Sequence, residues 1–250
     1  MAKAPDTLFL FVGEGISIFV KNENNESIFS RCVWKILEKQ GVCLADMQNK
    51  RKETRSKIDI SRRHVFASAM EKHAGSGVAD IFVIGEEVGR YGGAYGVTKG
   101  LIEEFGPERL VDTPISETGF VGMGGGLAAV GMRPIVEIMF PDFALMASDQ
   151  LFNQIRKLRH MYGGQVCFPL VLRTRVAIGY GYGGQHSMDP SSFFAQFSGW
   201  RIMAPSNAFD YVGLFNTAMR YADPVLIVEH GMLYAEEGRV PVNAQGEFLM

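Results

Sequence analysis

Six short apolar runs, separated by helical segments and all lying after residue 79, constrain the fold of this chain most strongly. The runs are rich in β-branched residues and lack a clean two-residue alternation, as expected for strands that are buried on both faces of a sheet. They are DIFVIG (80–85), RLVDTPI (109–115), PIVEIM (134–139), FPLVLRT (168–174), RIMAPS (201–206) and VLIVEH (225–230). Right-handed crossovers between such strands produce a mainly parallel sheet. We therefore expect an α/β fold with about six strands and helices on both faces.

The helical segments end at residues that commonly stop helices. We expect helices at 94–105, 117–130, 143–162 and 208–221. Glycine follows the first three segments, and Asp223-Pro224 follows the fourth. Ligands of parallel sheets bind at the carboxyl ends of the strands, so the loops after the strands are the place to look for chemistry.

The first sixty residues have a different character. LFLFVG (8–13) and ISIFVK (16–21) predict a hairpin around Glu14-Gly15, and residues 27–41 predict an amphipathic helix. The segment 50–63 carries seven basic residues against two acidic ones. We interpret it as a solvated linker, with a docking patch for an acidic partner as the alternative. The expected divisions are an N-terminal extension with this basic linker (1–57), the α/β domain (58–240) and a polar tail (241–250).

Composition excludes several classes of protein. The chain has 25 Lys and Arg against 27 Asp and Glu, so overall positive charge does not attract nucleic acid. The three widely spaced cysteines fit neither a disulfide framework nor a zinc site. No apolar run approaches the ~20 residues that span a bilayer. We expect a cytoplasmic protein with no nucleic-acid or membrane partner.

A glycine-rich loop follows the fourth apolar run. GYGYGG (179–184) satisfies the pattern G-x-G-x-x-G, but the chain continues to Pro190 before a helix can begin. A dinucleotide fingerprint needs the helix immediately, so we interpret the glycines as a flexible loop that permits close approach. His186 lies in this loop and can serve as an acid, a base or a hydrogen-bond donor.

Glu117 begins the helix expected after the second apolar run. In the structural interpretation, Ser116 caps the helix and the carboxylate complements the helix dipole. In the functional interpretation, apolar neighbours exclude water, and a desolvated carboxylate can exchange protons near neutral pH. These neighbours are Pro114, Ile115, Phe120, Val121 and Met123. The residues alone leave both interpretations open.

Four longer segments support a resemblance to a known family. They are IGEEVGRYGGAYGVTKGL (84–101), DTPISETGFVGMGGGLAAVGMRPIVEIMFPDFALMASDQ (112–150), GGQHS (183–187) and PSNAFDYVGLF (205–215). Together they resemble the beta subunit of thiamine-diphosphate-dependent 2-oxo acid dehydrogenases, which include the pyruvate, branched-chain and acetoin enzymes. The likeness runs from about residue 58 to 235 and implies the pyrimidine-binding domain of the transketolase-like superfamily.

The resemblance implies a role for individual residues. Glu117 matches the carboxylate that hydrogen-bonds a ring nitrogen of the cofactor's aminopyrimidine and promotes its activation. Phe143 matches the aromatic residue that packs on the pyrimidine, and Ile115 belongs to the same cofactor site. His186 matches an active-site histidine near the reacting carbon and the incoming lipoyl group. A structural monovalent cation, such as potassium, is implied at Leu170, Ala218, Tyr221 and Asp223.

The resemblance also implies partners. Thiamine diphosphate would be shared with an alpha-type subunit that holds the magnesium ion, and a lipoyl-bearing acyltransferase would receive the product. The beta subunits of this family normally continue into a C-terminal association domain, so this chain would be a free-standing or truncated pyrimidine domain or part of a divergent split system. The alternatives are a non-catalytic dimerisation or scaffold module and a subunit of a transketolase-like ketol transferase.

Self-association into a dimer or heterotetramer is expected in every case. Glycines at positions 122, 124, 125 and 126 weaken the helix expected at 117–130. They indicate close contact with another helix, with packing against the domain's own sheet as the alternative. The sequence does not identify the 2-oxo acid.

Overall fold

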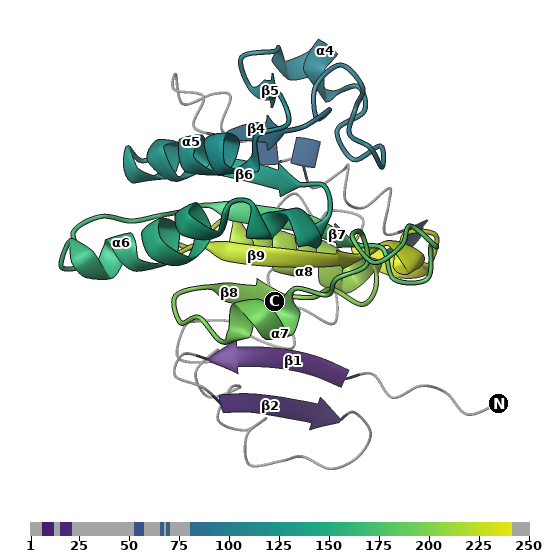
Figure 1. Ribbon diagram of the computed structural model, residues 1–250. Coiled ribbons are helices and arrows are strands. Elements are labelled where there is room, and N and C mark those ends of the chain that lie inside the picture. The colour runs from purple at the N-terminus through teal and green to yellow at the C-terminus, as the bar shows by residue number, and fades with distance from the viewer. Residues whose placement is uncertain are drawn as a thin grey trace. The chain divides into compact units, whose positions relative to one another are not determined.

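The computed structural model describes residues 7–12, 16–21, 53–57, 66–67, 69–70 and 81–241 (Figure 1). The chain divides into two compact units. The first comprises Met1–Thr54 with Pro241–Asn243, and the second comprises Arg55–Val240 with Ala244–Met250. Within the described ranges, every helix is too short or too polar to span a bilayer.

The first unit contains a β-hairpin. β1 (Thr7–Val12) and β2 (Ile16–Lys21) pair antiparallel, with Thr7 opposite Lys21 and Val12 opposite Ile16. The two strands of the predicted hairpin are therefore confirmed. The helix expected at 27–41 lies outside the described residues.

A further strand, β3 (Glu53–Lys57), lies in the basic segment. It pairs with β10 (Glu237–Pro241) in a two-stranded sheet. Five residues of this segment therefore form a strand, and the solvated linker stays a prediction. High charge does not prevent backbone groups from pairing with the exposed edge of another strand.

The second unit is built on a six-stranded sheet in the order β5-β4-β6-β7-β9-β8. All neighbouring strands are parallel, which confirms the predicted α/β fold. Each expected apolar run overlaps one strand. The strands are β4 (Ile81–Gly85), β5 (Leu110–Asp112), β6 (Arg133–Ile138), β7 (Val171–Val176), β8 (Arg201–Met203) and β9 (Val225–His230).

Residues in alternate rows across the sheet belong to two separate hydrophobic cores. One row contains Val83, Ile135, Val171 and Val225, which are directly opposite one another in four adjacent strands and belong to the first core. The next row contains Ile84, Val136, Leu172 and Leu226, which belong to the second core. Because successive side chains of a strand point to opposite faces, both faces are apolar and need helices to cover them.

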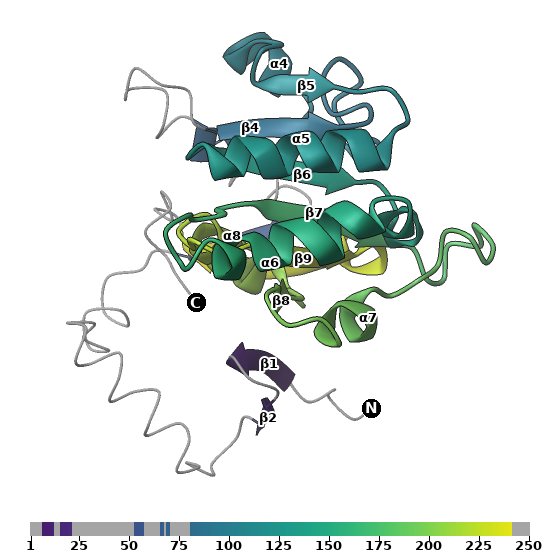
Figure 2. The same cartoon turned by 60° about the vertical axis from the view of Figure 1, so that its left-hand side comes forward.

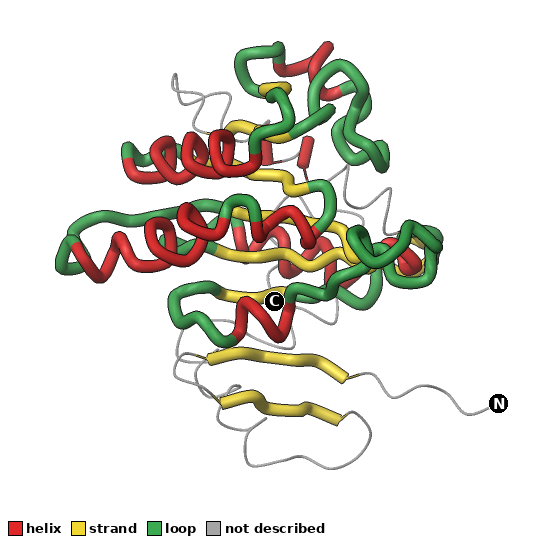
Figure 3. The backbone as a smooth tube through the Cα atoms, in the orientation of Figure 1, coloured by secondary structure: helices red, strands yellow, loops and turns green. Residues whose placement is uncertain are grey.

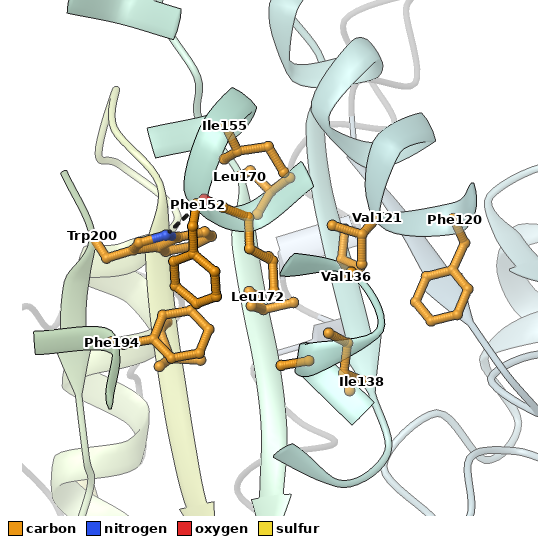
Figure 4. Packing of buried hydrophobic residues seen from close by; sticks show 14 of the residues in the cluster. Phe120, Val121, Val136, Ile138, Phe152, Ile155, Leu170, Leu172, Phe194 and Trp200 are labelled. Carbon is orange, nitrogen blue, oxygen red and sulfur yellow. Dashed lines mark hydrogen bonds between the residues drawn. The ribbon is translucent and has the colours of Figure 1, made fainter. Parts of the chain in front are cut away.

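Helices cover both faces of this sheet. Figures 1 and 2 show α5 (Glu117–Ala129) and α6 (Arg156–Met161) in front of the sheet and α8 (Ala208–Ala218) behind it. The front face carries the second core, to which α7 (Ser191–Ala195) contributes Phe194 beside Trp200 (Figure 4). The rear face carries the first core, which includes Tyr211 and Phe215 of α8.

Two of the four expected helices form differently. The segment 94–105 is helical only in α4 (Leu101–Phe105). Gly96 and Gly100 adopt φ angles of 74° and 81°, and such left-handed residues interrupt a helix. The segment 143–162 is divided into a 3₁₀ turn η1 (Pro141–Leu145), a π-helix η2 (Asp149–Ile155) and α6.

Side chains bind two carbonyl oxygens of η2. The indole Nε1 of Trp200 donates to the Leu151 carbonyl at 3.2 Å, and Arg156 Nε donates to the Phe152 carbonyl at 2.6 Å. Donors from outside the backbone ladder therefore satisfy carbonyls in the part of the segment that departs from α-helical pairing. Figure 4 shows this hydrogen bond of Trp200 as a dashed line, and Phe194 contacts both Phe152 and Trp200.

The glycines of α5 pack closely against the chain itself. A Cβ atom at Gly124 would lie 2.5 Å from Val136 Cγ2 on β6, and one at Gly125 would lie 3.0 Å from Ile155 Cγ1. A Cβ atom at Gly126 would meet nothing within 4 Å. Packing within the chain, against β6 and the π-helix η2, thus accounts for Gly124 and Gly125, so contact with a partner molecule is not needed to explain them.

Candidate active site

The loops that follow the strands meet at the carboxyl edge of the sheet. Figure 3 shows the loops after β4 and β7 in green on the same side of the sheet. The loop after β5 leads into α5, and the chain after β6 continues through Phe140 into η1. This edge contains Glu117, Phe143, His186 and Ile115, the four residues that the resemblance assigns to the cofactor or substrate site.

Glu117 is the first residue of α5 and is only 8% exposed. No hydrogen bond reaches its carboxylate from the residues that the structure describes. The Ser116 hydroxyl makes no capping hydrogen bond, so the expected side-chain cap was wrong. The Ser116 carbonyl instead accepts from the backbone N–H groups of Gly119 and Phe120. The helix start therefore presents a largely buried glutamate whose carboxylate has no hydrogen-bond partner among the described residues.

The expected apolar shield around Glu117 forms only in part. Phe120 and Val121 are 3% and 0% exposed, because they lie one helical turn further on, against the sheet. Ile115 is 84% exposed and Met123 is 48% exposed. Since Ile115 precedes the first turn, it leaves an apolar surface beside Glu117 that no described residue covers.

Glu86 was missed by sequence reasoning. It directly follows β4, and its Oε1 atom is buried without a hydrogen-bond partner. Burial raises the pKa of the Glu86 carboxyl, and the negative charge of Glu117 raises it further. The edge of the sheet therefore brings two carboxyl groups close enough to interact. Its place directly after a buried strand was the only sequence signal.

The loop that carries Glu86 is anchored to β5. Asp112 accepts hydrogen bonds from the backbone N–H groups of Gly89 at 2.6 Å and Arg90 at 3.1 Å. A Cβ atom at Gly89 would lie 2.6 Å from the Asp112 carboxylate, so the close approach requires glycine. This attachment fixes the loop that positions Glu86.

The structure brings Phe143 and His186 into contact. The His186 ring meets Phe140 edge to face at 4.7 Å and Phe143 at 5.2 Å between ring centroids. Two hydrogen bonds hold the surrounding elements. Thr118 Oγ1 donates to the Met146 carbonyl, linking the start of α5 to the end of η1. The Met188 N–H donates to Asp142 Oδ2 at 3.2 Å, linking the loop of His186 to η1.

A buried ion cluster lies beneath this edge on the rear face of the sheet. Arg173 Nε and Nη2 donate to the Glu229 carboxylate at 2.8 and 2.6 Å, and Nη1 donates to Glu137. Tyr211 and Tyr234 donate hydroxyl hydrogen bonds to Glu229 at 2.7 and 2.8 Å. Burial opposes the charge of Arg173, but the two carboxylates outweigh burial and hold its pKa well above the ordinary arginine value. The cluster ties β6, β7 and β9 together.

The residues expected to hold a monovalent cation lie at the opposite, amino edge of β7 and β9. These are Leu170, Ala218, Tyr221 and Asp223. The Tyr221 carbonyl accepts from Arg133 Nη1 at 3.1 Å. The Asp223 carboxylate pairs with Arg159 and lies 3.5 Å from Arg201 Nη2. Its charge is thus already compensated, and the cation site stays a prediction. The described part of the chain contains no group of at least three His, Cys, Asp or Glu side chains that could hold a metal ion.

Comparison with known protein families identifies the family of this chain. The sequence model of the family described as "Transketolase, pyrimidine binding domain" matches residues 59–236. The chain belongs to this family. A solved structure described as a split gene transketolase in an inactive beta4 tetramer superposes on this chain with a TM-score of 0.51 at 19% identity. That match covers 68% of this chain and 51% of the other, and it shows the shared fold.

Curated relatives of this chain are named as subunits of pyruvate dehydrogenase. The mitochondrial E1 component subunit beta-1 of Arabidopsis thaliana is 41% identical over 178 residues, covering 71% of this chain and 49% of the relative. The E1 component subunit beta of Rickettsia conorii is 44% identical over 186 residues, covering 74% and 56%. The chain spans about half the length of these relatives. Because the plant relative is named mitochondrial, the expected cytoplasmic location stays a prediction.

Proposed function

We propose that this chain supplies the aminopyrimidine-binding half of a thiamine-diphosphate-dependent 2-oxo acid dehydrogenase, as a beta-type subunit. The observation that carries the proposal is Glu117, a largely buried residue at the carboxyl edge of the sheet whose carboxylate receives no hydrogen bond from the described residues. Similarity to subunits named for pyruvate dehydrogenase supports a 2-oxo acid as the substrate.

The residues around Glu117 fit an aminopyrimidine. A carboxylate without a partner is the acceptor that a protonated ring nitrogen needs, and the Phe143 ring offers a flat apolar surface for stacking. When bound, thiamine diphosphate supplies the electron sink that decarboxylation of a 2-oxo acid requires. Glu117 would hold the proton at the ring nitrogen. Ile115 would line the same site.

Two further groups would assist the reaction. Glu86 takes up a proton more readily than an ordinary glutamate, because burial and Glu117 raise its pKa. Its protonation would reduce the negative charge beside Glu117. His186, held edge-on by Phe140 and Phe143, would give or accept a proton beside the reacting group.

The remaining parts of the enzyme would come from partners. An alpha-type subunit would bind the diphosphate and its magnesium ion, and a lipoyl-bearing acyltransferase would take the acyl group. The exposed side chains of Ile115, Met123 and Met146 beside the start of α5 support burial of this surface in an assembly.

The test is decarboxylation by the assembled complex. The full chain is co-expressed with the alpha-type subunit of its genome and assayed with pyruvate and a branched-chain 2-oxo acid. We expect Glu117→Gln to lower kcat by about 100-fold or more while size-exclusion chromatography shows an intact complex. Glu104→Gln on α4, which changes an exposed glutamate, is the matched control and should keep full activity. Full activity of Glu117→Gln would refute the role assigned to Glu117.

A further inference from the structure

Arg175 is a buried cation that the proposed chemistry does not use. It lies on β7, two residues after Arg173, and is 3% exposed. In the sheet register it stands directly opposite Glu229. That glutamate is already engaged by Arg173 and two tyrosines, and no described carboxylate forms an ion pair with Arg175. Its Nε and Nη1 atoms are buried without a hydrogen-bond partner. A charged group in this state needs another source of stabilisation.

Aromatic rings supply that stabilisation. The guanidinium carbon of Arg175 lies 3.5 Å from the centroid of the Tyr95 ring and 4.3 Å from that of Tyr180. Tyr234 and Tyr182 complete the surroundings at 5.7 and 5.8 Å. Cations are attracted to ring faces within about 6 Å, and the attraction is stronger away from water. The four tyrosines come from the chain segments that follow β4, β7 and β9, so one side chain contacts three loops at the carboxyl edge.

The glycine-rich segment after β7 is shaped for this contact. Gly179, Gly181 and Gly183 have φ angles of 91°, 76° and 82°, which side-chain-bearing residues rarely adopt. They alternate with Tyr180 and Tyr182, whose rings stack at 5.8 Å with an interplanar angle of 10°. The pattern GYGYGG therefore presents two tyrosines to the arginine. This gives a physical role to a motif that does not serve as a dinucleotide fingerprint.

The same contacts join this loop to the segment after β9. The Tyr180 hydroxyl donates to the Gly231 carbonyl at 2.8 Å. A Cβ atom at Gly231 would lie 2.4 Å from Arg175 Nε, so the backbone approaches the guanidinium as closely as glycine permits. Figure 1 shows the two segments beside each other at the right of the sheet. The arginine is thus enclosed between two loops and their tyrosines.

A short chain of rings connects Arg175 to the active-site histidine. Tyr182 and Tyr95 meet Phe140 at 5.9 and 6.1 Å, and Phe140 meets His186 at 4.7 Å. The His186 backbone N–H also donates to the carbonyl of Gly183 in the same loop, at 3.3 Å. The position of His186 therefore depends on the loop that the arginine holds.

We propose that Arg175 is a positioning residue that clamps the loop of residues 177–187 through Tyr95 and Tyr180 and so seats His186 against Phe140. A role for this seating in the reaction rests on the proposed function. The seating itself does not, and it can be measured on the full chain without cofactor, substrate or partner.

The test combines hydrogen exchange with chemical modification. Arg175→Met keeps a long, unbranched side chain with an apolar stem but removes the charge. In this variant we expect the backbone amides of residues 178–186 to exchange at least about tenfold faster. We expect diethyl pyrocarbonate to modify His186 at least about threefold faster, as the ring loses its contacts. The amides of β4, β6 and β9, and the rate at His160, should stay at wild-type values. Arg175→Lys, which keeps the charge, should restore part of the protection.

Arg90→Met, which removes an exposed arginine from the loop after β4, is the matched control and should change none of these rates. If Arg175→Met also exposes the strands, Tyr180→Leu decides the question, because Tyr180 is 39% exposed and lies outside the sheet. That variant should loosen residues 178–186 and His186 alone. The proposal would be overturned if the loop exchanged and His186 reacted at wild-type rates in Arg175→Met, or in Tyr180→Leu where that variant decides.

Discussion

The close packing of α5 on the sheet predicts opposite effects for the same substitution at two positions. Gly124→Ala and Gly126→Ala each replace glycine by alanine inside one helix, so each gains about 1 kcal/mol of helix propensity. At Gly124 the new Cβ would lie 2.5 Å from Val136 Cγ2 and 3.5 Å from Leu170 Cδ1. At Gly126 it would meet nothing within 4 Å. The propensity gain is common to both variants and cancels in their comparison.

The difference between the two variants therefore measures overpacking. Val136 is fully buried in β6, and its β-branched side chain has little rotamer freedom with which to move away. Overpacking of this kind costs about 1–3 kcal/mol. We expect Gly124→Ala to be less stable than Gly126→Ala by that amount, and Gly126→Ala to be more stable than the wild type. Urea unfolding of the full chain, followed by circular dichroism, measures both free energies. Equal stability of the two variants would show that α5 does not approach β6 this closely.

Two further predictions concern buried charges. Arg173→Met leaves two buried carboxylates uncompensated, so we expect the free energy of unfolding, measured with urea, to fall by about 3–5 kcal/mol. The control Arg90→Met, which changes an exposed arginine, should leave it nearly unchanged. A small decrease for Arg173→Met would contradict the role of the ion cluster. Burial, and then the charge of Glu117, raise the pKa of the Glu86 carboxyl. The folded chain therefore binds this proton more tightly than the unfolded chain does. As a result, the contribution of Glu86 to stability falls as pH rises through its raised pKa. Glu86→Gln should therefore be more stable than the wild type at pH 7 and lose this advantage as pH falls toward the ordinary glutamate value of 4.5, a trend that thermal unfolding across this range would detect or rule out.

The parallel sheet could be predicted because its signal is local. Each strand carries an apolar run, and stop residues separate the runs, so strand number and direction follow from alternation alone. The shortened α4 could not be predicted with the same ease. Gly96 and Gly100 are compatible with a helix in sequence, and their left-handed conformations become evident only in the folded loop. The strand β3 depends on pairing with β10, nearly 200 residues away along the chain.

The candidate site was predictable only in part. The residues alone left Glu117 open between a dipole partner and a catalytic acid, and the resemblance to a family gave it a role. Glu86 was missed because its interest comes from burial beside Glu117, which is a property of the tertiary structure. The same holds for Arg175, since four tyrosines from separate loops surround it only after folding.

The most direct test of the central claim is the affinity of the assembled complex for thiamine diphosphate. Isothermal titration in the presence of magnesium would compare the wild type, Glu117→Gln and the control Glu104→Gln. A hydrogen bond to a charged group contributes about 1.5–3 kcal/mol, so Glu117→Gln should raise the Kd about 10- to 150-fold. The control should leave the Kd unchanged. Equal affinity of the two variants would contradict the assignment of Glu117 to the aminopyrimidine.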